Sequence, residues 1–184
     1  MWAGGWGQRG YTKISNIFNH RGHGGSQRNF VFCARVQSAD TNPRIVMASP
    51  RLAPTARVNL LTGIIITAAM KVHSLLGPGL LESAYEACLV HELRKQGLEV
   101  RNQVVLPVVY DGTTIDLGYR LDLLAEESVI VELKCTDGFH PIHQAQLLSY
   151  LKLSGKNVGL LINFHVTHLR NGIQRMVNGK NWTK

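Results

Sequence analysis

The chain has 184 residues, of which 45% are hydrophobic and 17% are charged. It is long enough for one domain with some chain left over, and too apolar to be wholly disordered. The formal net charge of +8 is uneven: residues 1–57 hold eight Lys or Arg against one acid, and residues 58–184 hold twelve against eleven. The whole-chain charge therefore does not indicate that the second part binds nucleic acid.

The cysteines and the apolar stretches indicate a cellular compartment. Three scattered Cys residues, with no Cys-x-x-Cys pair, exclude a disulfide framework and favour a reducing compartment, which we expect to be the cytoplasm. The longest apolar stretches are interrupted by Lys71, His73 and Glu82. They fall short of about 20 apolar residues, so no transmembrane helix and no membrane association are expected.

Residues 1–57 are predicted to form a disordered, basic, Gly/Arg-rich tail, because no stretch keeps a helical or strand period. Three interpretations of it remain open. It can be a solvated tail, an over-extended start with Met47 as the alternative first residue, or an arm that contacts phosphates.

Two helices are expected next. The first begins at Asn59 or Thr62, which can cap it, and continues to Leu76 with a broad apolar face. Gly77-Pro78-Gly79 ends it, and a second helix is predicted from about Leu80 to Gln96, with Glu86 facing outward.

Strands follow the helices. A strand from Val100 to Tyr110 leads into Asp111-Gly112, a strong hairpin signal, and the return strand is expected from about Thr114 to Leu124. The later elements are a strand at 129–135, a helix at 143–153, an apolar strand at 158–163 and a mixed C-terminal segment. This order predicts an α/β domain over residues 58–178, with helices covering a sheet and a short tail at 179–184.

Three charged residues on two of these strands point to chemistry. Glu132 and Lys134 are two apart on one strand, so both side chains lie on the same sheet face. The turn at 125–128 lets Asp122 approach Glu132 across the ladder. Two adjacent carboxylates repel each other, and a divalent cation such as Mg²⁺ or Mn²⁺ would remove that conflict. Taken alone, Glu-x-Lys is more typical of a solvent-facing pair.

The wider pattern resembles a known family. Gly79-x-x-Glu82-x-x-Tyr85, Asp122, Glu132-x-Lys134 and Gln146-x-x-x-Tyr150 occur in this order. Together they look like the GxxExxY proteins, which belong to the RecB-like branch of the PD-(D/E)XK nuclease superfamily. The resemblance covers roughly residues 60–178. It implies a restriction-endonuclease-like core, a mixed β-sheet flanked by helices, and metal-dependent hydrolysis of nucleic acid, with DNA favoured over RNA.

The resemblance also implies roles for single residues. Asp122 and Glu132 would bind Mg²⁺ or Mn²⁺, with the Leu133 carbonyl as a third oxygen and Glu82 completing the shell directly or through water. Lys134 would act on the attacking water and the scissile phosphate. Gln146 and Tyr150 would face the same site, and Tyr85 would pack or hydrogen-bond beside Glu82.

Other interpretations stay open. Tyr85 and Tyr150 can equally be core residues with a hydrogen-bonded hydroxyl. His140 and His143 near Cys135 lack a fourth ligand for zinc. The domain can also be a module that binds nucleic acid without cutting it, or an interaction protein. The sequence leaves the oligomeric state and any partner protein open.

Overall fold

The computed structural model describes residues 53–179, and all structural statements below concern this range. Its helices are α2 (Pro54–Leu76), α3 (Glu82–Lys95) and α4 (Pro141–Ser154), with a short 3-10 helix η1 (Leu169–Gly172). Its strands are β1 (Val100–Tyr110), β2 (Thr113–Ala125), β3 (Val129–Lys134), β4 (Val158–Asn163) and β5 (Ile173–Val177). The α/β fold expected from the sequence is confirmed, and the element bounds differ from the expected ones by a few residues at most sites.

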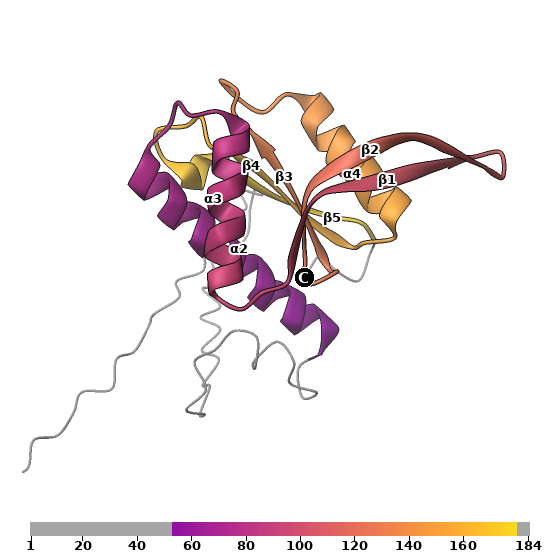
Figure 1. The fold of residues 1–184 in the computed structure, drawn as a ribbon, viewed down its shortest axis with the longest axis horizontal. Helices are drawn as coiled ribbons and strands as arrows, with labels where there is room; N and C mark the ends of the chain where they lie inside the picture. The colour runs from indigo at the N-terminus through magenta and orange to yellow at the C-terminus, as the bar shows by residue number, and fades with distance from the viewer. Residues whose placement is uncertain (1–52, 180–184) are drawn as a thin grey trace, which may run out of the picture. The chain divides into compact units, whose positions relative to one another are not determined.

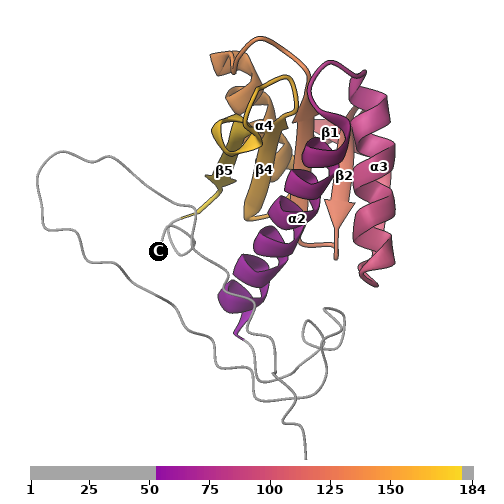
Figure 2. The same ribbon diagram turned by 90° about the vertical axis from the view of Figure 1, so that its left-hand side faces the viewer.

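The five strands form one mixed sheet in the order β1-β2-β3-β4-β5 (Figure 1). Only β3 and β4 run parallel, and α4 connects them, as a parallel pair requires. Helices α2 and α3 cover one face of the sheet, and α4 covers the other (Figure 2). β4 is buried along its whole length, as predicted for a strand in the middle of a sheet.

The first helix begins earlier than expected, and the tail boundary moves with it. α2 starts at Pro54, so residues 54–57 belong to the domain and not to the predicted tail. A proline fits the first turn because its φ is already helical and its missing N–H would have no partner there. The Pro54 signal therefore outweighed the capping residues Asn59 and Thr62. Residues 1–52 and 180–184, which hold most of the two predicted tails, lie outside the described residues.

The length and composition of α2 matter for the expectation that no helix of the chain spans a membrane. With 23 residues, it is long and apolar enough to cross a membrane by length and composition alone. One of its faces, however, contributes Leu61, Ile65 and Ala69 to the core, each with no exposed surface. This packing is that of a core helix in a folded domain.

The β1–β2 hairpin extends beyond the rest of the sheet (Figure 1). β2 pairs with β3 only at residues 123–125, whereas its pairing with β1 continues to the turn. The turn at Asp111 and Gly112 has positive φ at both residues, as the Asp-Gly signal predicted. We call residues 105–119 the β1–β2 arm; the ladder shifts register there between Leu106 and Val108.

Candidate active site

The site begins where β2 and β3 separate. The last ladder pair is Leu123 with Val131, and continuing the same register places Asp122 opposite Glu132. At this point Asp122 Oδ2 accepts a hydrogen bond of 2.8 Å from the Leu133 backbone N–H. The Lys134 carbonyl is turned the other way, toward β4, where it accepts from the Phe164 N–H. Because backbone groups alternate along a strand, the Leu133 carbonyl lies on the Asp122 side.

Glu132 is the most unusual acid in this cluster. Only 2% of the residue is exposed. Its Oε1 pairs with Lys134 Nζ at 2.7 Å, while its buried Oε2 has no hydrogen-bond partner within the described part of the chain. Burial, followed by the charge of Asp122, raises the pKa of Glu132 to about 7 despite the attraction of Lys134. Glu132 thus has one oxygen available for a positive ligand.

Asp122 and Lys134, the charged groups beside Glu132, also have shifted pKa values. Burial raises the pKa of Asp122, although the hydrogen bond from Leu133 and the charge of Lys134 oppose this change. Burial also disfavours the Lys134 ammonium, but the hydrogen bond and the charge of Glu132 outweigh it and raise the pKa of Lys134. One buried cation faces at least two carboxylates, so the cluster favours additional positive charge.

Glu82 approaches from the other side of the sheet, as the first residue of α3. Burial raises the pKa of Glu82, and the charge of Lys134 lowers it while that of Asp122 raises it. Glu82 is therefore close enough to Lys134 and Asp122 to interact with their charges.

Tyr85 packs in the core and holds the loop before α3. It is fully buried, and its ring stacks on Phe164 with centroids 4.4 Å apart. Its hydroxyl donates to the Gly77 carbonyl at 2.6 Å and accepts from the Leu80 N–H at 3.2 Å. Gly79 adopts a φ of +106°, which L side chains rarely adopt. Tyr85 and Gly79 therefore hold the loop that delivers Glu82, and the core interpretation of Tyr85 agrees with these contacts.

Gln146 and Tyr150 lie one turn apart on α4, and Gln146 Nε2 donates to the Tyr150 hydroxyl at 2.6 Å. Only 3% of Tyr150 is exposed. Burial raises the pKa of Tyr150, and among the smaller causes are the charges of Glu132 and Asp122, which raise it further. The pair thus borders the acidic cluster from the α4 side.

The oxygen donors of the cluster fit a hard divalent cation, although the side chains do not form a complete cage. Within residues 53–179, no three His, Cys, Asp or Glu side chains are grouped closely enough to hold a metal by themselves. Mg²⁺ does not require such a cage, because it usually keeps several waters and takes one or two carboxylates. Asp122, the unpartnered Glu132 oxygen and the adjacent Leu133 carbonyl satisfy that requirement.

A comparison of the sequence with protein families identifies the superfamily of the domain. The family model described as the PD-(D/E)XK nuclease superfamily matches residues 59–176. The chain belongs to the PD-(D/E)XK nuclease superfamily. Neither the curated proteins nor the solved structures compared with the chain include a significant match. The nucleases of this superfamily generally use divalent metal ions, which agrees with the donor set around Glu132.

The PD-(D/E)XK domain departs from the superfamily name at one position, because Leu121 precedes Asp122 where the name has Pro. Leu121 is 2% exposed and packs in the core on the α4 side. The position therefore contributes packing rather than a functional group.

Two nearby residues were missed or misplaced by sequence reasoning. Glu86, expected to face outward, accepts hydrogen bonds from Asn102 and Gln103 on β1, and its charge contributes to the raised pKa of Asp122. Its position one turn after Glu82 was the available signal. Asn163, only 1% exposed, pairs with both backbone groups of Thr136 and so fixes the chain just after Lys134.

His140 and His143, which lack a fourth ligand for zinc, hold the start of α4. His140 Nδ1 accepts from the Ile142 N–H, and His143 Nδ1 accepts from the His140 N–H. These bonds cap the start of α4.

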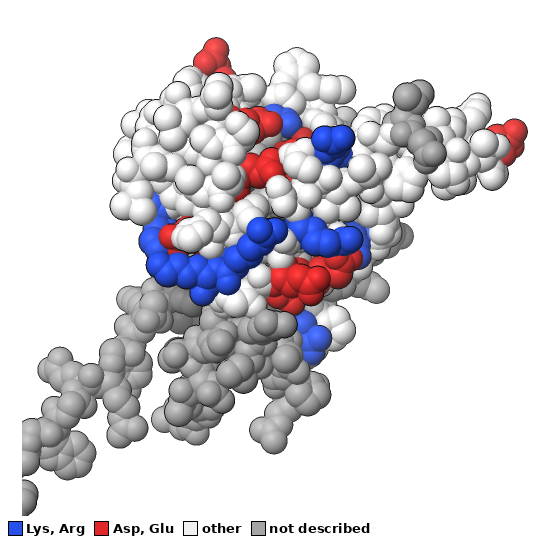
Figure 3. Space-filling model, in the orientation of Figure 1, with Lys and Arg blue, Asp and Glu red and all other residues white. Residues whose placement is uncertain are grey.

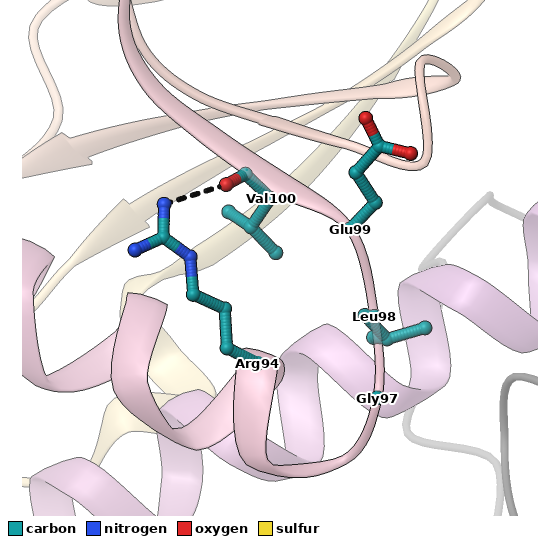
Figure 4. Close-up of a pocket in the computed structure, with 5 residues that line it drawn as sticks. All are labelled: Arg94, Gly97, Leu98, Glu99 and Val100. Atoms are coloured by element: carbon teal, nitrogen blue, oxygen red, sulfur yellow. Dashed lines mark hydrogen bonds between the residues drawn. The ribbon is translucent and has the colours of Figure 1, made fainter.

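Charged side chains are unevenly distributed over the face of the domain shown in Figure 3. A few acidic and basic side chains gather in its upper half between uncharged areas, and larger groups of both signs lie below. A separate hollow is lined by Arg94, Gly97–Glu99 and Val100, where Arg94 donates to the Val100 carbonyl at 2.8 Å (Figure 4). It lies at the opposite end of the 14-residue α3 from Glu82, about 20 Å away along the helix. It is therefore not part of the candidate site.

Proposed function

We propose that this chain is a metal-dependent nuclease of the GxxExxY family, in the RecB-like branch of the superfamily, and that it hydrolyses phosphodiester bonds of DNA. The observation that carries the proposal is the buried Glu132 carboxylate, which lies opposite Asp122 with one oxygen paired to Lys134 and the other unpartnered. Such an arrangement is costly for a fold to maintain unless a positive ligand uses it.

The metal would be Mg²⁺ or Mn²⁺. Asp122, Glu132 and the Leu133 carbonyl would hold it, with Glu82 joining directly or through a water. When bound, the ion would activate the attacking water and neutralise charge on the phosphate. In its absence the carboxylates repel one another, which agrees with the raised pKa of Glu132.

The remaining residues would act on the substrate. The Lys134 side chain is 14% exposed, so its ammonium can reach a phosphate oxygen while staying bonded to Glu132. Its charge would stabilise the negative charge that develops in the transition state. The Tyr150 hydroxyl already accepts from Gln146 and keeps its own proton for an acceptor at the site.

Cleavage assays test the proposal directly. Linear DNA and RNA are incubated with the intact chain in Mg²⁺ or Mn²⁺, and Lys134→Ala is compared with the wild type. We expect the substitution to reduce cleavage by about 100-fold or more, as for a lost transition-state contact, and to weaken binding far less. Lys71→Ala is the matched control, because Lys71 is an exposed lysine that pairs with Glu92 on α3.

The opposite pattern would favour a binding module. In that case neither protein cleaves DNA, and Lys134→Ala measurably loses affinity. Equal cleavage by both proteins, with contaminating nuclease excluded, would refute the proposed role of Lys134.

The setting of the protein is also a proposal. Cys88 and Cys135 are free thiols, which suits the cytoplasm. The described domain has eleven Lys or Arg and eleven Asp or Glu. Such a neutral domain has little nonspecific attraction to a duplex, so a partner protein would supply part of the affinity.

A further inference from the structure

Two segments beside the acidic cluster contain no Lys or Arg. The α2–α3 loop, residues 77–81, contains no charged residue and exposes Leu80 at 43% and Leu81 at 78%, directly before Glu82. The β1–β2 arm carries the exposed Asp111 at its tip and contains no Lys or Arg in its sequence. These segments therefore offer no side-chain cation to the phosphates that a duplex presents to a protein.

Tyr119 is an exposed aromatic residue that contacts Tyr150, which borders the acidic cluster. It lies at the base of the β1–β2 arm, is 48% exposed, and its ring is 5.4 Å from that of Tyr150. Tyr150 is buried and is held by Gln146, so Tyr119 rests on a fixed support. The first cation after the arm, Arg120, is the next residue and therefore points to the other face of β2.

We propose that Tyr119 stacks on an unpaired base, and that the substrate is single-stranded nucleic acid whose bases contact these two segments, which contain no Lys or Arg. The inference rests on the proposed nuclease function and narrows its substrate class. A base presents an aromatic face only when it is unpaired and unstacked, and tyrosine rings bind such faces with little sequence preference. In a duplex the faces of the bases are hidden, and segments without Lys or Arg would meet phosphates instead.

The test measures binding of the intact chain to a labelled single-stranded oligonucleotide and to its duplex. EDTA prevents cleavage, and raised salt reduces the contribution of the basic residues before the domain. We expect tighter binding of the single strand. Tyr119→Ala should weaken that binding by about tenfold, the size of one lost base stack, and leave duplex binding unchanged.

Further variants separate stacking from folding. Tyr119→Phe should retain binding because it keeps the ring, and Tyr119→Leu should lose it although the residue stays apolar. Tyr110→Ala is the control: Tyr110 is 72% exposed but lies at the tip of the arm. In Mg²⁺, Tyr119→Ala should raise KM for single strands more than it lowers kcat, because stacking binds ground and transition states alike.

Each outcome bears on one proposal. The stacking inference is wrong if the wild type binds single strand and duplex equally well. It is also wrong if Tyr119→Ala binds the single strand as tightly as the wild type does. In either case, cleavage that depends on Lys134 would still uphold the nuclease. Selective binding of single strands that Tyr119→Ala weakens by about tenfold, without any cleavage, upholds the stacking of Tyr119 on an unpaired base and rejects the nuclease. If Tyr119→Ala instead dissociates a dimer and leaves nucleic-acid binding intact, the surface is a protein interface and the inference is wrong.

Discussion

Glu132→Gln is expected to stabilise the metal-free protein at neutral and alkaline pH. The pKa of Glu132 rises from an ordinary 4.5 to about 7 because the carboxylate is buried beside Asp122. This difference corresponds to about 3 kcal/mol. This pKa of about 7 already includes the attraction of Lys134, which lowers the pKa of Glu132 but does not return it to 4.5.

The pH dependence follows from the sign of the shift. At low pH the carboxyl is protonated in both the folded and the unfolded protein, so Glu132 has no effect on stability. As pH rises from about 4.5 to 7, the unfolded chain loses its proton first and the free energy of unfolding falls. The loss is complete above pH 7. Because Gln stays neutral, the variant should match the wild type near pH 4 and exceed it by up to about 3 kcal/mol at pH 8.

Urea unfolding at pH 4 and pH 8, in EDTA and in MgCl₂, measures this difference. A metal that binds only the folded wild type adds about 2.7 kcal/mol at a concentration 100 times Kd. Mg²⁺ should therefore remove or reverse the advantage of Glu132→Gln at pH 8. Glu92→Gln is the control with the opposite sign, because the hydrogen bond from Lys71 lowers the pKa of Glu92. A Glu132→Gln variant that is less stable than the wild type at pH 8 in EDTA would refute the reasoning.

Three further outcomes are expected. Lys134→Arg should not restore the cleavage lost in Lys134→Ala, because a planar guanidinium cannot replace a compact ammonium beside a water; steady-state rates measure this. Tyr85→Phe should lower the free energy of unfolding in urea by about 1–2 kcal/mol, because two backbone groups of the preceding loop lose their partner. The same substitution should reduce cleavage. Tyr110→Phe, at an exposed tyrosine, should change neither stability nor cleavage. A chain that starts at Ala53 should keep the melting temperature of the full chain. A chain that starts at Asn59 should melt several degrees lower, because it lacks the first turn of α2 and the buried Val58. Equal melting temperatures for the two shortened chains would contradict the assigned start of α2.

Local patterns in the sequence were sufficient for most elements of the fold. The Asp111-Gly112 turn, the alternation that places Glu132 and Lys134 on one face, and the apolar β4 strand depend on neighbouring residues, and the structure contains all three. The start of α2 was misplaced because two competing signals, a proline and two capping residues, occur within nine residues. Here the helix starts at the proline, whose φ suits the first turn.

The site required tertiary structure for its decisive features. The sequence by itself determined which acids and which lysine are present, and the strand period put two of them on one face. Whether Asp122 faces Glu132 depends on where the β2–β3 ladder stops, and the unpartnered Glu132 oxygen depends on how closely α4 and the sheet enclose it. The contact of Tyr119 with Tyr150 joins an arm to a helix more than 20 residues away. Distances between segments remote in sequence follow from the packing of the whole chain, which no local pattern specifies.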